Sequence, residues 1–427
     1  MKYRKRIIDN DLNSREQAFG GLNIVGPKGC GKTRTAKERC KSIVEFQDED
    51  KRDSLLYIAE IIPSSLLNDK KPILFDEWQD APKIWGTVRA ACDNEDCFGE
   101  YYLTGSSSKY IDTPHSGTSR ISTVEMLPMS LYESGESNGL ISLSGLFNNQ
   151  QTKIDGIKNS LDIPGLIYPA CRGGWPKTLA IKSKEAKLLV AKDYFKQIFQ
   201  EDISRIDHVK RNPDWARAIL KSYARNAGTL VKKEVIYKDA SSSTGMSEDT
   251  FDIYVDKLKQ LYVIDDIEAW YPQIRSEKAL RSPLKRMFID PSIAIAALGV
   301  SPSYFIHDLD TFGHIFESLV FRDLKIYSSS FGGTLSHYHD AYGLEVDGVL
   351  HLEDGRYALV EIKLGGQRIQ SGIDNELKIC RLIKEDNEKG KGLKIPDPSF
   401  LMVVTGTEYA YRSREGVFVV PIGCLKD

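Results

Sequence analysis

The sequence predicts an α/β protein of three domains, and three observations support this fold class. Near its start, a glycine-rich turn joins a short apolar run to a helical pattern. Helical patterns dominate the middle of the chain, and two apolar runs separated by a short turn predict a β-hairpin in its last third. The 427 residues exceed what one core holds at about 100 to 200 residues per domain. We place the domains at residues 1–155, 156–303 and 304–427.

The composition is ordinary for a globular protein, with 28% charged and 41% apolar residues. The net charge of -2 means that any nucleic-acid-binding surface must be local. No apolar run approaches the roughly 18 residues of a membrane span, and the first residues lack the apolar region of a secretory signal. Seven cysteines without a CxxC pair predict free thiols. We therefore expect a cytoplasmic protein without a membrane partner.

The first domain contains a phosphate-binding motif. In LNIVGPKGCGKTRTAKERC, the run Leu22 to Val25 predicts a strand and a helix begins at about Lys32, with GxxxxGK[ST] between them. Glycines let backbone N–H groups surround phosphates, while Lys32 reaches the β- and γ-phosphates and the Thr33 hydroxyl ligates Mg²⁺. The motif predicts ATP and Mg²⁺ as cofactors, held by Gly26, Pro27, Lys28, Gly29, Cys30, Gly31, Lys32, Thr33 and Arg34.

Two further strands end in polar residues. Asp76 and Glu77 follow the apolar run of KPILFDEWQDAP, where Asp76 would hold Mg²⁺ through water and Glu77 would polarise the attacking water. As an alternative, the two carboxylates could cap a helix. The strand in EYYLTGSSSKY ends at Thr104 and Ser106, whose hydroxyls could sense the γ-phosphate or belong to a serine-rich turn.

Five segments together resemble a known family. GPKGCGKTRTA, LFDEWQDAPKIW, YLTGSSS, HSGTSRIS and MLPMSLYESGESNG occur in the order of the bacterial and archaeal AAA-type ATPases that carry a C-terminal domain of unknown function 4143. This likeness covers essentially the whole chain. It implies that Arg120 contacts the γ-phosphate of this subunit or of a neighbour in a homo-oligomer. The chain has Ser119 where the family usually shows glycine.

We interpret the middle domain as an adaptor. Polar sequence at about 134–156 predicts the boundary, and helices are expected at about 184–199 and 214–227. From Leu230 to Ile289, the order of helix, turn, helix and two strands predicts a winged helix. Its second helix carries acidic residues that a duplex would repel, namely Glu248, Asp249, Asp252 and Asp256. The following basic run could contact a nucleic-acid backbone, so protein packing and DNA contact both stay open: Arg275, Lys278, Arg281, Lys285 and Arg286.

The C-terminal domain contains a hairpin in YGLEVDGVLHLEDGRYALVEIKLG. If residues 353–355 form a three-residue loop with Gly355 in the left-handed conformation, Leu352 pairs with Arg356. Counting outward then places Asp347 opposite Glu361. Lys363 lies on the same face, so three charged groups converge there.

Two opposed carboxylates favour a cation between them. Asp347 followed by Glu361-Ile362-Lys363 resembles the D…(D/E)xK pattern of the restriction-endonuclease-like fold. Asp347, Glu361 and the Ile362 carbonyl would ligate Mg²⁺, and Lys363 would position the water that attacks a phosphodiester. Glu317 is a fourth member, on a preceding helix. An ordinary Glu–Lys pair on a nuclease-like fold without activity is the alternative.

The sequence therefore predicts an ATPase that couples Mg-ATP hydrolysis to a nuclease-like domain acting on DNA. The alternative is a nucleotide-dependent switch whose C-terminal domain binds a protein partner or a nucleic acid without cleaving.

Overall fold

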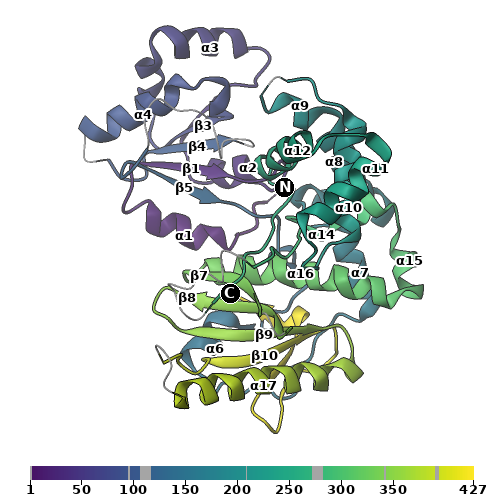
Figure 1. Cartoon of the computed structure of the whole chain (residues 1–427). Coiled ribbons are helices and arrows are strands. Elements are labelled where there is room, and N and C mark those ends of the chain that lie inside the picture. The colour runs from purple at the N-terminus through teal and green to yellow at the C-terminus, as the bar shows by residue number, and fades with distance from the viewer. Residues whose placement is uncertain are drawn as a thin grey trace.

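The computed structural model describes residues 2–94, 97–105, 117–207, 209–271, 282–340, 343–389 and 394–427. Figure 1 shows an N-terminal α/β unit in purple and blue, a helical region in teal, and a second α/β unit in green and yellow. Of the helices in these ranges, none combines the length and the hydropathy needed to span a bilayer.

The N-terminal unit alternates strands and helices. Its strand β1 is buried along its whole length, as its apolar sequence GLNIV favours. The elements in chain order are α1 (Ile8–Arg15), β1 (Gly21–Val25), α2 (Lys32–Lys37), β2 (Ser42–Glu45), α3 (Arg52–Ile61), η1 (Pro63–Leu67), β3 (Ile73–Asp76), η2 (Trp78–Asp80), α4 (Lys83–Asn94), β4 (Tyr101–Gly105), β5 (Ile121–Glu125) and α5 (Leu131–Ser134).

A five-stranded parallel sheet with the order β2-β3-β4-β1-β5 forms the centre of this unit. Helices α3 and α4 cover one face through a cluster that includes Phe75 and Trp85, and α1 and α2 cover the other through Leu12 and Ala36. Because all strands run in one direction, their carboxyl ends meet at one edge of the sheet. The loop after β1 and the polar ends of β3 and β4 therefore lie together.

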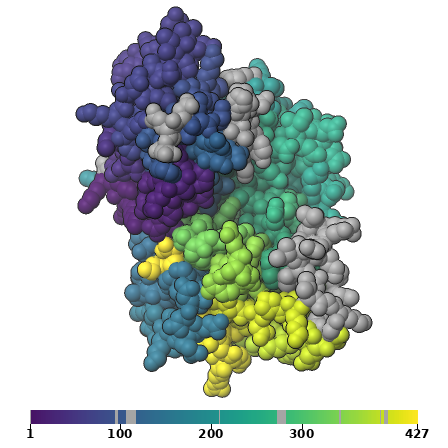
Figure 2. Space-filling model, turned by 90° about the vertical axis from the view of Figure 1, so that its left-hand side faces the viewer, coloured from purple at the N-terminus to yellow at the C-terminus, as the bar shows by residue number. Residues whose placement is uncertain are grey.

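Residues 137–161 pack against the C-terminal unit, although the predicted boundary assigns most of them to the first domain. Strand β6 (Ile141–Ser142) pairs in parallel with β13 (Leu425–Lys426), and the ring of Phe147 in α6 (Leu143–Asn148) packs on Phe400. In Figure 2 this blue segment lies beside the yellow C-terminal residues. The physical reason is an apolar contact that local sequence does not reveal.

Helices form most of the middle region, and those expected at about 184–199 and 214–227 are present as α8 and α10. Two antiparallel bridges, Ile264 with Phe288 and Ile267 with Lys285, follow α12. The elements are α7 (Ile163–Arg172), η4 (Pro176–Ala180), α8 (Lys184–Gln197), the π-helix η5 (Ile198–Asp202), α9 (Ile203–Arg205), α10 (Pro213–Arg225), α11 (Lys233–Thr244), α12 (Glu248–Gln260), α14 (Pro291–Leu298) and α15 (Pro302–His307).

The C-terminal unit is a six-stranded mixed sheet with the order β11-β12-β10-β9-β8-β7, set between two long helices (Figure 1). One face shares a continuous core with α16 and the middle helices, while Ile373 and Ile379 of α17 cover the other. Its elements are α16 (Leu309–Ser329), β7 (Gly333–His339), β8 (Glu345–Leu352), β9 (Tyr357–Lys363), η6 (Gly366–Arg368), α17 (Ile369–Glu388), β10 (Phe400–Thr405), β11 (Tyr411–Arg412), β12 (Phe418–Pro421) and η7 (Ile422–Cys424), followed by β13.

Candidate functional site

The predicted phosphate-binding loop joins β1 to α2. Gly26 has a φ of 141°, and a Cβ atom there would lie 2.2 Å from the carbonyl oxygen of Met126. Gly31 has a φ of 111° immediately before α2. A side chain is strained at both positions, so the turn depends on these two glycines.

Lys32 follows the loop and is buried, with 5% of its surface exposed. Its ammonium donates to the carbonyl oxygens of Gly26 and Pro27, both at 2.9 Å. These partners are neutral, and an ammonium bonds more strongly to anionic oxygens such as those of phosphate. The side chain is therefore placed to exchange loop carbonyls for a bound anion.

Asp76 lies beside the hydroxyl of Thr33. Thr33 Oγ1 donates to Asp76 Oδ1 at 2.7 Å, and Thr104 Oγ1 donates to the same oxygen at 2.5 Å. A hydroxyl beside a carboxylate is the ligand pair that P-loop proteins offer to Mg²⁺, so these residues fit that ion. Thr104 is fully buried and bonds to Asp76, and its contact with the γ-phosphate stays a prediction. Ser106, predicted beside it, lies outside the described residues.

Glu77 has an unusual backbone conformation at the end of β3. Its φ of 54° and ψ of 47° lie in the left-handed region, which costs a non-glycine residue roughly 1–2 kcal/mol. Its carboxylate accepts a hydrogen bond from the side chain of Gln79. Such strain concentrates at functional sites, because the turn directs a side chain that a regular strand would place elsewhere.

Arg120 lies at the opposite end of the sheet from the phosphate-binding loop. β1 and β5 are parallel, with Gly21 paired to Ile121, so Arg120 stands at the amino end of both strands. Its Nε donates to Asp93 at 2.5 Å, and half of the side chain is exposed. The preceding Ser119 has a φ of 67°, the conformation that the family's glycine would favour. The structure does not bring Arg120 to the loop of its own chain.

The other predicted loop residues have mixed surroundings. Lys28 Nζ donates at 2.5 Å to Asp202, a buried carboxylate at the end of the π-helix η5 in the middle region. Cys30 is buried and its thiol donates to the Met126 carbonyl at 3.3 Å. Arg34 pairs with Glu38 on the surface of α2. The loop is thus tied directly to the middle region.

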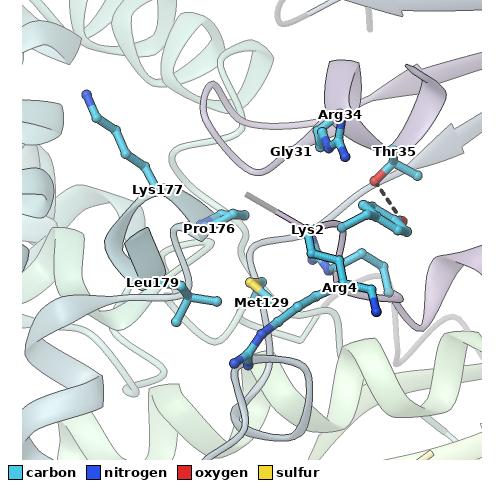
Figure 3. Close-up of a pocket in the computed structure, with 11 residues that line it drawn as sticks. Lys2, Arg4, Gly31, Arg34, Thr35, Met129, Pro176, Lys177 and Leu179 are labelled. Carbon is cyan, nitrogen blue, oxygen red and sulfur yellow. Dashed lines mark hydrogen bonds between the residues drawn. The ribbon is translucent and has the colours of Figure 1, made fainter. Parts of the chain in front are cut away.

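A pocket of about 320 Å³ opens beside Gly31, Arg34 and Thr35. Figure 3 shows Pro176 and Leu179 of the middle region across the pocket from them, with the Lys177 ammonium pointing away. Its lining is apolar at one wall and basic at the rim, formed by Lys2, Tyr3, Arg4, Arg6, Gly31, Arg34, Thr35, Met129, Pro176, Lys177 and Leu179.

The first residues of the chain shape this pocket, and the sequence reasoning missed them. The Tyr3 hydroxyl donates to Asp9 at 2.9 Å and lies 3.2 Å from Thr35 Oγ1, and burial raises the pKa of Tyr3 to about 12. Arg6 is buried, pairs with Glu133 at 2.9 Å, and donates at 2.8 Å to the Cys30 carbonyl in the loop. The dense run of basic and aromatic residues in MKYRKR was the available signal.

The predicted C-terminal hairpin is confirmed. The Leu352 amide donates to the Arg356 carbonyl at 2.9 Å, and Gly355 has a left-handed φ of 88°. Gly348 pairs with Val360 in the same register, so Asp347 stands opposite Glu361.

The charged residues of this hairpin bind one another. Lys363 Nζ lies 2.9 Å from Asp347 Oδ2 and 2.5 Å from Glu361 Oε2. Asp347 Oδ2 also accepts from the Ile362 amide at 2.8 Å, and Glu361 Oε1 accepts from Asn375 at 2.7 Å. Asp347, Glu361 and Lys363 therefore lie together as predicted, but the carboxylate oxygens accept hydrogen bonds from donors of the protein.

Glu317 of α16 points into the same cluster, where it pairs with Lys285 of the middle region. The ammonium of Lys285 also lies 3.8 Å from Asp347 Oδ1. Across the described ranges, no group of three or more His, Cys, Asp and Glu side chains is arranged to hold a metal ion. As placed, Glu317, Asp347 and Glu361 do not fit a divalent cation, because two ammonium groups lie among them.

This placement corrects the prediction for the basic run. Lys285 and Arg286 are buried, and Arg286 pairs with Asp266 at 2.8 Å, so neither side chain is available to a nucleic-acid backbone. The cause is a set of acidic partners from separate parts of the chain. Arg275, Lys278 and Arg281 lie outside the described residues.

Burial and charge shift the titration of this cluster. Burial, and then the nearby Asp347, raise the pKa of Glu361 to about 7. Burial also raises the pKa of Glu317 to about 7, against the opposing effect of Lys285. Burial disfavours the charged form of Lys363, but Asp347 and Glu361 outweigh it and raise its pKa.

Three family models match the chain. The family described as "AAA domain" matches residues 20–135, and two families described as domains of unknown function, DUF8612 and DUF4143, match residues 165–304 and 312–425. The first match ends before β6, consistent with the packing of residues 137–161 on the C-terminal unit. No curated protein matches the chain.

The solved structures that are similar to this chain share little of its sequence. The Walker-type ATPase of Pyrococcus abyssi is 12% identical, with a TM-score of 0.41 over 69% of this chain and 96% of that one. The ORC2 protein of Aeropyrum pernix is 14% identical, with a TM-score of 0.31 over 72% of this chain and 91% of that one. TM-scores below 0.5 do not establish a shared arrangement. The family matches do show that the chain contains an AAA-type P-loop ATPase domain and a DUF4143 domain.

Proposed function

We propose that this protein hydrolyses ATP with Mg²⁺ at the carboxyl edge of its N-terminal sheet. The observation that carries the proposal is the contact of Asp76 with Thr33 next to Lys32, whose ammonium bonds to two neutral carbonyls of its loop. Thr33 and Asp76 would hold the Mg²⁺ that accompanies the nucleotide, and a bound Mg²⁺ neutralises phosphate charge. The AAA-domain match supports the same activity.

The remaining residues have separate roles in this proposal. Lys32 leaves the loop carbonyls and binds the β- and γ-phosphate oxygens. Glu77 orients the attacking water and accepts its proton as the bond between the γ-phosphorus and the leaving ADP oxygen breaks. The left-handed turn at Glu77 supports this role, because it sets the carboxylate at the end of β3.

The pocket of Figure 3 is the proposed adenosine site. Its apolar wall, formed by Met129, Pro176 and Leu179, suits a purine ring, and its volume of about 320 Å³ is within the range of ligand pockets. Two of these residues belong to the middle region. A nucleotide in this pocket would therefore contact both the ATPase domain and the middle region, which the Lys28–Asp202 pair already links.

We also propose the finer identities of the other two domains. The order of α11, α12 and the bridged segments around Ile264 and Phe288 supports a winged helix. The hairpin with Asp347 opposite Glu361 supports a restriction-endonuclease-like fold. Domain limits at 1–155, 156–303 and 304–427 remain our proposal, except that residues 137–161 join the last unit as a discontinuous part.

Different observations favour two alternative functions of the C-terminal domain. The Asp347, Glu361 and Lys363 arrangement favours ATP-coupled cleavage of DNA, as in the D…(D/E)xK pattern. The position of Lys285 favours the switch that binds a protein or nucleic-acid partner without cleaving. We prefer the switch, since the ammonium groups already neutralise the cluster.

Phosphate release from ATP tests the proposed activity. Lys32→Ala should weaken nucleotide binding, whereas Glu77→Gln should bind ATP and hydrolyse it roughly 10²-fold more slowly, because only proton acceptance is lost. Glu60→Gln, an exposed surface acid of the same domain, is the matched control. A Glu77→Gln variant with the parent rate would remove Glu77 from the catalytic machinery.

A further inference from the structure

Lys285 is anchored in the middle region but extends into the C-terminal unit. Its backbone forms two hydrogen bonds with Ile267, each of 2.9 Å, which fix the start of the side chain. The side chain is only 1% exposed. An ammonium buried to this degree loses its hydration, which is unfavourable unless anionic partners replace the water.

Two of those partners, Glu317 and Asp347, are acids that the sequence assigned to a metal ion. The ammonium pairs with Glu317, lies 3.3 Å from the Asp347 carbonyl oxygen, and lies 3.8 Å from carboxylate oxygens of Asp347 and Glu345. It also lies 5.0 Å from the centre of the Phe321 ring, which adds a favourable cation–π contact.

Lys285 and Lys363 approach Asp347 from two sides. Lys285 is near Oδ1 and Lys363 is bonded to Oδ2. Together the two ammonium groups supply two positive charges, the charge of one Mg²⁺ or Mn²⁺. A divalent cation needs direct contact with the same oxygens, at about 2.0–2.1 Å for Mg²⁺, so it would have to displace Lys285 and leave that ammonium buried without its partners.

We propose that Lys285 is the resident cation of the C-terminal carboxylate site and excludes divalent metal from it. The protein as folded then binds no Mg²⁺ or Mn²⁺ between Glu317 and Asp347. Removal of the Lys285 ammonium converts the cluster into a metal site. This inference stands independently of the ATPase activity, because the nucleotide site shares none of these residues.

Direct binding of Mn²⁺ to the full chain tests the proposal. All variants carry Asp76→Asn, which removes the Mg²⁺ ligand of the nucleotide site, and no nucleotide is added. Lys285→Met should gain one Mn²⁺ site, measured by calorimetry, with an affinity at least about tenfold higher than any Mn²⁺ binding by the chain that carries Asp76→Asn alone. Adding Asp347→Asn should abolish that site. Lys325→Met, which removes a lysine paired with Asp265 at 2.5 Å, should gain nothing.

Two further variants guard against loss of folding, which circular dichroism reports. Lys285→Arg keeps the positive charge and should fold without binding Mn²⁺. Lys285→Met with Glu317→Gln removes a charge of each sign, and should still gain metal through Asp347 and Glu361. The proposal fails if the chain that keeps Lys285 binds Mn²⁺ in an Asp347-dependent way. It also fails if folded Lys285→Met gains no Mn²⁺ site. If Lys285→Met does not fold, the double variant Lys285→Met with Glu317→Gln replaces it in this test.

Discussion

The nucleotide site and the C-terminal carboxylate site both combine lysines with acids, but they pair them in opposite ways. In the first, the Lys32 ammonium bonds to neutral carbonyls, and the Asp76 carboxylate bonds to two hydroxyls. In the second, Lys363 bonds to two carboxylates, and Lys285 is buried against a third. One site keeps its positive and negative groups apart, and the other has already combined them.

This difference indicates what each site can accept. A cation held by neutral dipoles gains when an anion arrives, because charge-assisted bonds are about twice as strong. A buried ion pair has made that gain already, and removing one partner costs about 3–5 kcal/mol. The nucleotide site is therefore arranged for a charged ligand, whereas the C-terminal site is internally neutralised.

The largest expected effect comes from replacing one aspartate by asparagine in each of the two sites. Asp76→Asn should slow ATP hydrolysis roughly 10²- to 10³-fold, because it removes the carboxylate beside Thr33. Asp347→Asn should leave the hydrolysis rate within about twofold while lowering the stability of the C-terminal unit, since two lysines lose their shared partner. Phosphate release and thermal unfolding measure the two effects. Equal loss of hydrolysis in folded Asp347→Asn would show that the two sites are coupled.

If Arg120 reaches the γ-phosphate of a neighbouring subunit, the nucleotide site takes a cation from another chain, which sharpens the comparison. Arg120→Ala should slow hydrolysis roughly 10²-fold, and mixing it with Glu77→Gln should restore part of the rate by pairing intact halves. Arg89→Ala is a matched control, since Arg89 pairs with the same Asp93 at 2.8 Å. A mixture no faster than the sum of its components would exclude action between subunits.

The smallest effect concerns pH near the C-terminal site. Burial, and then the positive charge of Lys285, lower the pKa of His337 from 6.5 to about 4, and the ring contacts the Pro283 carbonyl at 3.1 Å. A lowered histidine pKa gives stability that is complete above pH 6.5 and is lost as the pH falls toward 4.

Between pH 6.5 and 5, the titration of His337 should therefore reduce the free energy of opening of β7 by about 1.6 kcal/mol. Hydrogen exchange of a peptide covering β7 measures that energy, and His337→Gln should lose this part of the pH dependence. Identical pH profiles for parent and variant would mean that His337 titrates normally, so that the cations of this site do not act on it.

Local signals explain which elements the sequence predicted. The loop between β1 and α2 follows from glycine spacing, and the hairpin follows from a short turn that needs a left-handed Gly355. Strand β3, which ends at Asp76, and strand β4, which contains Thr104 near its end, are short apolar runs followed by polar residues. Each signal lies within about 20 residues of chain, where backbone preferences and apolar periodicity dominate.

The missed features depend on contacts between distant segments. The local sequence suggests that Lys285 belongs to a basic surface run. Lys285 is buried against acids because α16 and β8, which carry Glu317 and Asp347, pack beside it. The position of Arg120 requires the parallel register of β1 with β5, which a single strand does not reveal. Tyr3 joins the pocket because the first residues pack on α2.

The pairing of β6 with β13 sets a time order on folding during synthesis. The hydroxyl of Ser142 donates at 2.7 Å to the carbonyl of Asp427, 285 residues later. At roughly 5–20 residues per second, a ribosome needs about 15 to 60 seconds between these two positions. The sheet of the N-terminal unit is complete once β5 is synthesised, so it can form early. The ring of Phe147 lacks its contact with Phe400 until that residue is synthesised. During that interval, the side chains of residues 137–161 that the C-terminal unit finally covers lack those contacts.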